Sequence, residues 1–249
     1  MSSVRLFFVF VTLQSLCNGF FAAKIPDYIH LCKRDQNTIS ECVLNSIKFL
    51  KPRLEKGLPE LDVPGFEPLV IKELMLDFGN VFKAVGRDVK IRGASNFDVK
   101  KFEVDLDQLE MKTRVLMPLI IQDGNYEVDA KLQMIPAIHT TGHIHSNATD
   151  CVSDIMMKSV LEKRNGSNYL KLVKVDMKVN VDDYDIYISD LFKGNPDIGR
   201  VVNSIVKDNK GEFLRASMPF LEKTVAHYLK KAANKILSKF TYDEVLPLP

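Results

Sequence analysis

The sequence predicts an α+β fold in which a long, strongly curved antiparallel β-sheet wraps around a long C-terminal α-helix. Between about residues 85 and 192, apolar residues alternate with charged ones, which is typical of strands with one solvated face. Farther along, apolar residues recur every three or four positions, as in an amphipathic helix. A sheet wrapped around one helix encloses an elongated interior, which side chains fill or which remains as a tunnel.

Composition and charge indicate a globular protein that does not bind nucleic acid. The chain has 249 residues, of which 46% are hydrophobic and 27% are charged, as expected of a globular protein. Its 34 basic and 32 acidic residues leave a formal net charge of +2, far below the basic excess of nucleic-acid-binding proteins. Nucleic acid is therefore excluded as a partner.

The first residues have the pattern of a secretory signal peptide. Arg5 precedes an apolar run, Leu6–Leu13, which is too short to span a bilayer and is followed by small residues. We expect cleavage after Gly19, with Ala22 and Ala23 as alternatives.

The signal peptide thus covers residues 1–19, and residues 20–249 are expected to form a single secreted, extracellular domain. No later apolar run approaches the length of a membrane span, so no stable membrane insertion is expected. The mature chain retains three cysteines, of which Cys32 and Cys42 are predicted to form a disulfide. We expect Cys151 to be a buried free thiol, with an intermolecular bridge as the alternative.

The mature chain contains two glycosylation sequons, at Asn147 and Asn165, each of which lies two positions before a Ser or Thr. In a secreted chain such sites are usable where they lie at the surface. We therefore predict glycans at both residues, on turns outside the concave face of the sheet.

A helix is predicted from about Thr38 to Lys56. Thr38 and Glu41 have the spacing of a capping box, and apolar residues then recur at helical spacing. Pro52 is expected to bend or interrupt the helix. Residues 57–68, which are rich in Gly and Pro, indicate a loop.

The strands of the sheet are expected to form a long meander. Apolar residues alternate along 102–106, 109–117, 126–134 and 173–181. Asp123 and Gly124 give a turn signal between the second and third of these runs.

The last third of the chain predicts one very long helix. Apolar residues from Leu214 to Phe240 have a mean spacing near that of an α-helix. Pro219 falls inside and is expected to kink it. The run Ile198–Ile205 predicts a shorter helix just before it.

No catalytic motif is present, so we do not expect an enzyme. The sequence lacks the nucleophile elbow, the zinc-protease helix motif and the glycine-rich phosphate and dinucleotide loops. His139, His143 and His145 are candidate zinc ligands, but nothing nearby supplies further ligands at fixed spacing. We therefore interpret them as solvated or hydrogen-bonded strand residues, and expect no metal and no cofactor.

The mature chain resembles the takeout and juvenile-hormone-binding protein family of arthropods. The similarity covers essentially the whole of it. The stretches that carry the resemblance are Cys32 to Cys42 with Lys33-Arg34-Asp35, Pro59-Glu60-Leu61 through Glu67-Pro68-Leu69-Val70-Ile71, Gly93-Ala94-Ser95-Asn96-Phe97, Gly124-Asn125-Tyr126-Glu127-Val128 with Pro136, and Ala233-Asn234-Lys235-Ile236-Leu237 through Thr241-Tyr242-Asp243-Glu244.

Three departures favour the takeout branch of this family. Ala130 stands where the family usually has Gly, and Thr241 stands where it favours Pro. Cys151 lacks the distant partner that would complete the second disulfide of the hormone-binding branch.

The resemblance implies an apolar tunnel between sheet and helix that carries a small hydrophobic ligand, such as a terpenoid, a juvenile-hormone-like compound or a fatty-acid derivative. Tyr126 is the first candidate for a polar contact with that ligand, with packing against a neighbouring strand as the alternative. A secreted interaction protein with a filled core and a lipid-metabolising enzyme are the other functions considered. A protein receptor of unknown identity is a further candidate partner. The residues expected to line the tunnel are Phe102, Val104, Met111, Tyr126, Val128, Met134, Met177 and Val225.

Overall fold

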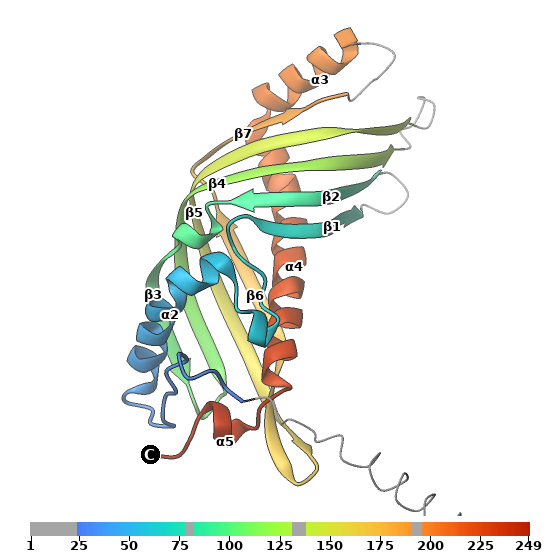
Figure 1. Ribbon diagram of the computed structural model, residues 1–249. Helices are drawn as coiled ribbons and strands as arrows, with labels where there is room; N and C mark the ends of the chain where they lie inside the picture. Colours follow the sequence, from blue (N-terminus) through green and yellow to red (C-terminus); the bar gives the residue numbers. More distant parts are fainter. Residues whose placement is uncertain (1–23, 78–81, 131–137, 191–195) are drawn as a thin grey trace, which may run out of the picture.

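The computed structural model describes residues 24–77, 82–130, 138–190 and 196–249. Within these residues it confirms the α+β class, because a curled antiparallel sheet of seven strands packs against a long C-terminal helix (Figure 1). The elements are α2 (Ile39–Lys56), η2 (Pro59–Leu61), β1 (Leu69–Asp77), β2 (Phe82–Arg92), η3 (Ala94–Asn96), β3 (Asp98–Asp105), β4 (Glu110–Ala130), β5 (Ile138–Arg164), β6 (Ser167–Asn180), β7 (Asp183–Ile188), α3 (Pro196–Asp208), α4 (Lys210–Leu237) and α5 (Tyr242–Val245).

Two long strands, β4 and β5, run through both halves of the sheet. In the lower half of Figure 1, β3 pairs with residues 110–116 of β4 and β6 pairs with residues 152–164 of β5. In the upper half, β2 pairs with residues 121–130 of β4, β1 pairs with β2, and β7 pairs with residues 144–149 of β5. The predicted meander is confirmed for β3–β4–β5–β6 and for β1–β2, whereas β2 pairs with β4 and β7 with β5 out of sequential order. Strands of 21 and 27 residues are long enough to take a different partner at each end.

A helix lies along each outer edge of the lower half. At the edge formed by β3, the Ser40 hydroxyl of α2 accepts a hydrogen bond from the Val104 amide at 2.9 Å. At the other edge, the Asn234 side chain of α4 accepts from the Leu172 amide at 2.8 Å and donates to the Leu172 carbonyl at 2.9 Å. Glu222 of α4 accepts from a third edge amide, that of β6 residue 179, at 2.9 Å. The two helices thus satisfy backbone groups that an open sheet edge leaves unpaired.

The C-terminal helices also reach the upper half. The Tyr228 hydroxyl of α4 donates to the Glu73 carbonyl of β1, which is the opposite edge of the sheet from β6. Asn203 of α3 accepts from the Ile188 amide at 3.0 Å and donates to its carbonyl at 2.7 Å. Helix α4 therefore bridges the two edges of the curled sheet.

The buried side of β4 changes between the two halves. In the lower half its half-buried apolar residues stand at odd positions, Met111–Met117, whereas in the upper half Ile120 and Tyr126 are buried at even positions. The change occurs at Pro118, which lies opposite Asp150 of β5. Pro118 has no amide proton for the ladder, and Asp150 has a φ of 47°.

The predicted turn at Asp123 and Gly124 is wrong. Both residues lie inside β4, paired with His145 and Ile144 of β5. The altered alternation of apolar residues in this region arises instead at the bend at Pro118.

Two other local predictions need correction. Strand β1 lies in a segment for which the sequence predicted no strand. Thr38 makes no capping hydrogen bond, because its hydroxyl donates to Asp35 at 3.1 Å in the preceding turn. The capping box lies at the other end of the chain, where Thr241 accepts from the Glu244 amide at 3.3 Å. The helical spans themselves are confirmed for α2, α3 and α4.

Asn147 does not lie on a turn. It is half-buried within β5, and its side chain accepts a hydrogen bond from the Asp185 amide at 3.2 Å. Asn165 is exposed on the turn between β5 and β6, as predicted. The next residue, Gly166, has a φ of 85°, which glycine adopts without strain and which this tight turn requires.

The lower end of the molecule is a closed core. The predicted disulfide between Cys32 and Cys42 is present. Leu58, Leu61 and Phe240 are buried together, which joins the loop after α2 to the end of α4. This core anchors both helices that flank the lower half of the sheet.

Candidate ligand-binding site

The lower half of the sheet has one apolar face, which we call the inner face. Strand register places its residues in rows across four strands, because antiparallel partners point to the same side of a sheet. The first row is Val104, Met111, Met157 and Val175; the second is Phe102, Thr113, Ile155 and Met177; the third is Val99, Val115, Ser153 and Val179.

Four of the predicted lining residues meet on this inner face. Phe102, Val104, Met111 and Met177 lie in two adjacent rows, although they come from three strands. Val225, the fifth, is half-buried on α4. The predicted lining residues of β3, of the first half of β4 and of β6 therefore all lie on the inner face.

The inner face is covered incompletely. Every residue in its rows except Ser153 is half-buried, whereas a close-packed interior buries its side chains almost completely. Thr113, Ile155 and Met157 belong to this face and were missed by the sequence analysis. The alternation of Cys151, Ser153, Ile155 and Met157 was the available signal.

The opposite, outer face of the lower half is charged. Arg114 binds Asp154 across the strands through two hydrogen bonds of 2.6 and 2.9 Å, which lowers the pKa of the Asp154 carboxyl. Lys158 donates to Glu110 at 3.0 Å in the same way. The contrast between the two faces identifies the inner face as the one that excludes water.

Tyr126 and Val128 lie in the upper half, where Tyr126 is buried and Val128 is half-buried. Tyr126 is 7% exposed, and its hydroxyl donates to the Ser189 carbonyl at 2.6 Å. Burial raises the pKa of this phenol. Its contact is therefore made by protein, which agrees with the alternative considered for it. Met134, the remaining predicted lining residue, lies outside the described residues.

Gly142 permits this packing. A Cβ at Gly142 would lie 2.3 Å from the Ser189 carbonyl oxygen and 2.7 Å from the Tyr126 hydroxyl. Thr140, two positions earlier, donates to the Asp190 carbonyl at 3.1 Å. The segment after β7 is thus held directly against β5.

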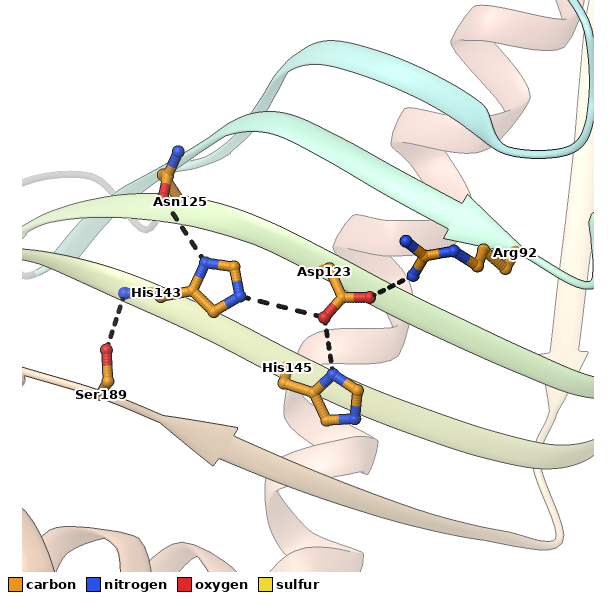
Figure 2. A network of polar contacts seen from close by, with 6 residues as sticks. All are labelled: Arg92, Asp123, Asn125, His143, His145 and Ser189. Carbon is orange, nitrogen blue, oxygen red and sulfur yellow. Dashed lines mark hydrogen bonds and ion pairs between the residues drawn. The ribbon is translucent and has the colours of Figure 1, made fainter.

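The histidines considered as zinc ligands lie on the outer face of the upper half (Figure 2). His145 Nδ1 is 2.7 Å and His143 Nε2 is 3.9 Å from the same Asp123 oxygen. Arg92 donates to the other oxygen at 2.6 Å. The hydrogen bond with His145, followed by that from Arg92, lowers the pKa of Asp123. These histidines are hydrogen-bonded strand residues.

The third histidine has a different set of neighbours. His139 lies near Glu127 and Asp129, with their nitrogen and oxygen ligand atoms within 4.8 Å of one another. Arg87 already donates to Glu127 at 3.2 Å, and His139 Nδ1 is 2.8 Å from an Asp129 oxygen. Both carboxylates therefore have cationic or hydrogen-bonding neighbours, and we assign no metal to them.

Cys151 lies at the junction of the two halves. It is a free thiol that is 5% exposed, as predicted. Burial raises the pKa of this thiol to about 11, which makes it a poor nucleophile at neutral pH.

Two open grooves lie elsewhere on the protein. One, of about 1000 Å³, lies between the N-terminal segment, α2 and the C-terminal residues, and Phe49 and Leu31 are exposed in it. The other, of about 820 Å³, lies beside Pro219 and Lys223 of α4 and is lined by charged outer-face residues together with Thr113, Ile155, Val175 and Met177 of the inner face. Of the predicted lining residues, Met177 alone borders it.

Comparison with known proteins agrees with this architecture. Residues 6–247 match the family model described as "Haemolymph juvenile hormone binding protein (JHBP)". The crystal structure of Epiphyas postvittana Takeout 1 superposes with a TM-score of 0.70 at 16% sequence identity, covering 88% of this chain and 99% of that one. A crystal structure of lipopolysaccharide binding protein gives a TM-score of 0.38 at 13% identity, covering 80% of this chain and 39% of that one. None of the curated proteins compared matches the chain.

None of the described helices combines the length and apolar character needed to cross a membrane.

Proposed function

Because the chain belongs to the haemolymph juvenile hormone binding protein family, we propose that its inner face binds a small hydrophobic ligand and that the protein carries it in an apolar tunnel between the sheet and α4. Membership of this family makes the chain a binding protein and not an enzyme. The ligand itself is a terpenoid-like or fatty-acid-like molecule in this proposal.

The incomplete burial of the inner face carries the proposal. Its rows are apolar and flanked by a helix on each side, yet their side chains keep part of their surface exposed. Apolar surface in this state is stabilised when a ligand covers it. A filled core would leave no such surface, so the same observation disfavours the interaction-protein alternative.

The expected affinity follows from the area that a ligand buries. Ten to fifteen ligand carbons at about 0.8 kcal/mol each contribute roughly 8 to 12 kcal/mol, from which several kcal/mol of association cost are subtracted. Micromolar to submicromolar dissociation constants are therefore expected. Apolar contacts of this kind discriminate weakly between ligands of similar size.

Two adjacent methionines of β5 provide the test. Met157 belongs to the inner face, whereas Met156 points to the outer face, opposite Lys112 and Asp176. The chain contains no tryptophan, so Met157→Trp and Met156→Trp each introduce one unique fluorophore. Uptake of a naphthylamine probe and thermal stability are measured for both variants and the wild type.

We expect Met157→Trp to fold and to weaken uptake at least tenfold, because the indole occupies ligand volume. Its emission should shift to the blue when a fatty-acid ester is added. Met156→Trp should bind like wild type. Absence of saturable uptake by wild type, together with a large loss of stability in Met157→Trp, would replace the carrier with an interaction protein.

Secretion is part of the same proposal. We propose that residues 1–19 are removed, that residues 20–249 fold as one domain, and that Asn165 is glycosylated because it is exposed on a turn. Asn147 is a poorer acceptor, since its side chain is hydrogen-bonded within the sheet. Peptide mapping of the protein secreted by insect cells tests each of these statements.

A further inference from the structure

Ser153 stands out among the inner-face residues. It is completely buried, with 0% exposure, and its hydroxyl has no hydrogen-bond partner in the part of the chain that the structure describes. Buried side-chain hydroxyls are almost always paired, because an unpaired one loses its hydrogen bond to water without replacement. The absence of a protein partner at this position therefore needs an explanation.

Other hydroxyls near the interior are satisfied by the protein. Thr113, in the adjacent row of the inner face, donates to the Lys101 carbonyl at 2.9 Å. Tyr126 and Thr140 of the upper half donate to backbone carbonyls. Among the described residues, Ser153 is the one buried hydroxyl left without a partner.

The surroundings of Ser153 are apolar. Its row neighbours are Val115 and Val179, and the next residues on the same face of β5 are Cys151 and Ile155. None of the residues in the three rows carries a charge. Among the described residues no acceptor is left for the Ser153 hydroxyl, so we consider one that a bound ligand supplies.

We propose that Ser153 is the polar contact of the bound ligand, and that the ligand is an uncharged lipid bearing an oxygen acceptor, such as an ester, ketone or epoxide. The hydroxyl donates a hydrogen bond to this oxygen once the ligand displaces the half-buried side chains that cover it. A carboxylate is disfavoured, because a buried anion needs a cation that the inner face does not supply. This inference rests on the proposed function and specifies the ligand class.

Matched ligands test the chemistry. Competition against N-phenyl-1-naphthylamine is measured for methyl hexadecanoate, hexadecane and hexadecanoate with wild type, Ser153→Ala and Thr113→Val. Wild type should bind the ester roughly three to ten times more tightly than the alkane. Ser153→Ala should lose that preference while its affinity for the alkane stays unchanged. Thr113→Val, which removes a hydroxyl already paired with protein, should keep the preference.

The unliganded protein gives a second readout. The melting temperature of Ser153→Ala should equal or exceed that of wild type, because the substitution removes an unpaired buried hydroxyl. A clear fall in melting temperature would mean that the hydroxyl already has a partner, and would overturn the assignment. Equal binding of ester and alkane by wild type, or tighter binding of hexadecanoate, would also overturn it and leave the carrier function standing. Failure of wild type to take up the probe would instead refute the carrier function itself.

Discussion

The two halves of the sheet share the strands β4 and β5 but have different interiors. In the upper half, Ile120 and Tyr126 are buried and the hydroxyls of Tyr126 and Thr140 are bound by protein. In the lower half, the inner face is half-buried and no described residue pairs with the Ser153 hydroxyl. An apolar strand face is therefore not in itself a ligand site, since the same strand is packed at one end and open at the other.

Small residues account for much of the difference. In the upper half, Val89 packs over Gly124, where a Cβ would lie 3.0 Å from its Cγ2 atom, and Ser189 packs over Gly142. The rows of the inner face contain no glycine and include three methionines. Glycine lets backbone approach backbone, whereas long flexible side chains leave adaptable space.

The largest effect is expected at Gly142, where the backbone of the upper half leaves no room for a side chain. Gly142→Ala should destabilise the protein by about 3 kcal/mol, because the methyl group meets a backbone oxygen that cannot move alone. Urea unfolding measures the change. Gly199→Ala in α3, where the added Cβ meets nothing within 4 Å, is the control and should be neutral or stabilising. A tolerated Gly142→Ala would show that the upper half is looser than described.

Val128→Trp makes the comparison with Met157→Trp direct. Val128 is half-buried on the same strand face as the buried Tyr126, between Ala84 and Thr140. We expect a loss of about 2 kcal/mol, the typical cost of overpacking, whereas Met157→Trp should lose less stability and more binding. Thermal melts and probe uptake of the two variants measure these two effects. Equal behaviour would mean that the two halves form one continuous tunnel.

The two asparagine contacts with strand edges should differ in strength. Asn234→Ala removes both hydrogen bonds to Leu172, which is 3% exposed, and should cost about 2 kcal/mol. Asn203→Ala removes the same pair at Ile188, which is half-buried and more open to water, and should cost about 1 kcal/mol. Exposed Asn168 of β6 is the control. The reverse order would indicate that α3 rather than α4 is the principal edge cover.

The smallest effect is expected at the exposed outer face of the upper half. The hydrogen bond with Asp129 raises the pKa of His139 above its ordinary value of about 6.5. The folded pKa is the higher one, so this contribution to stability is complete below about pH 6.5 and disappears as the pH rises through the raised folded pKa. NMR titration of the His139 ring should show a downward shift in Asp129→Asn and none in Asp123→Asn. A His139 pKa at or below 6.5 in wild type would contradict the contact.

Local patterns predicted several features that the structure confirms. The helices α2 and α4, the disulfide between Cys32 and Cys42, and the alternation along β4 all follow from residue type and spacing within short segments. The inner-face position of Phe102 follows in the same way, because side chains alternate along any strand. These features depend on neighbours in sequence.

The errors lie where distant segments meet. Pairing of β2 with β4, and the place of Asn147 inside β5, depend on which strands become neighbours across the fold. The partner of the Tyr126 hydroxyl, the Ser189 carbonyl, likewise lies far away in the sequence. No local pattern contains these partners.

The sequence by itself determined the secretory pattern and the apolar faces, because composition and periodicity are properties of the chain alone, and the resemblance of its motifs indicated the family. The tertiary structure decided which apolar face is packed and which is open. That choice depends on the bend at Pro118 and Asp150, where the buried side of the strands changes, and on the helix that covers each edge. It also decided that Ser153 has no partner among the described residues, since the pairing of a buried hydroxyl depends on every segment that the fold brings near it.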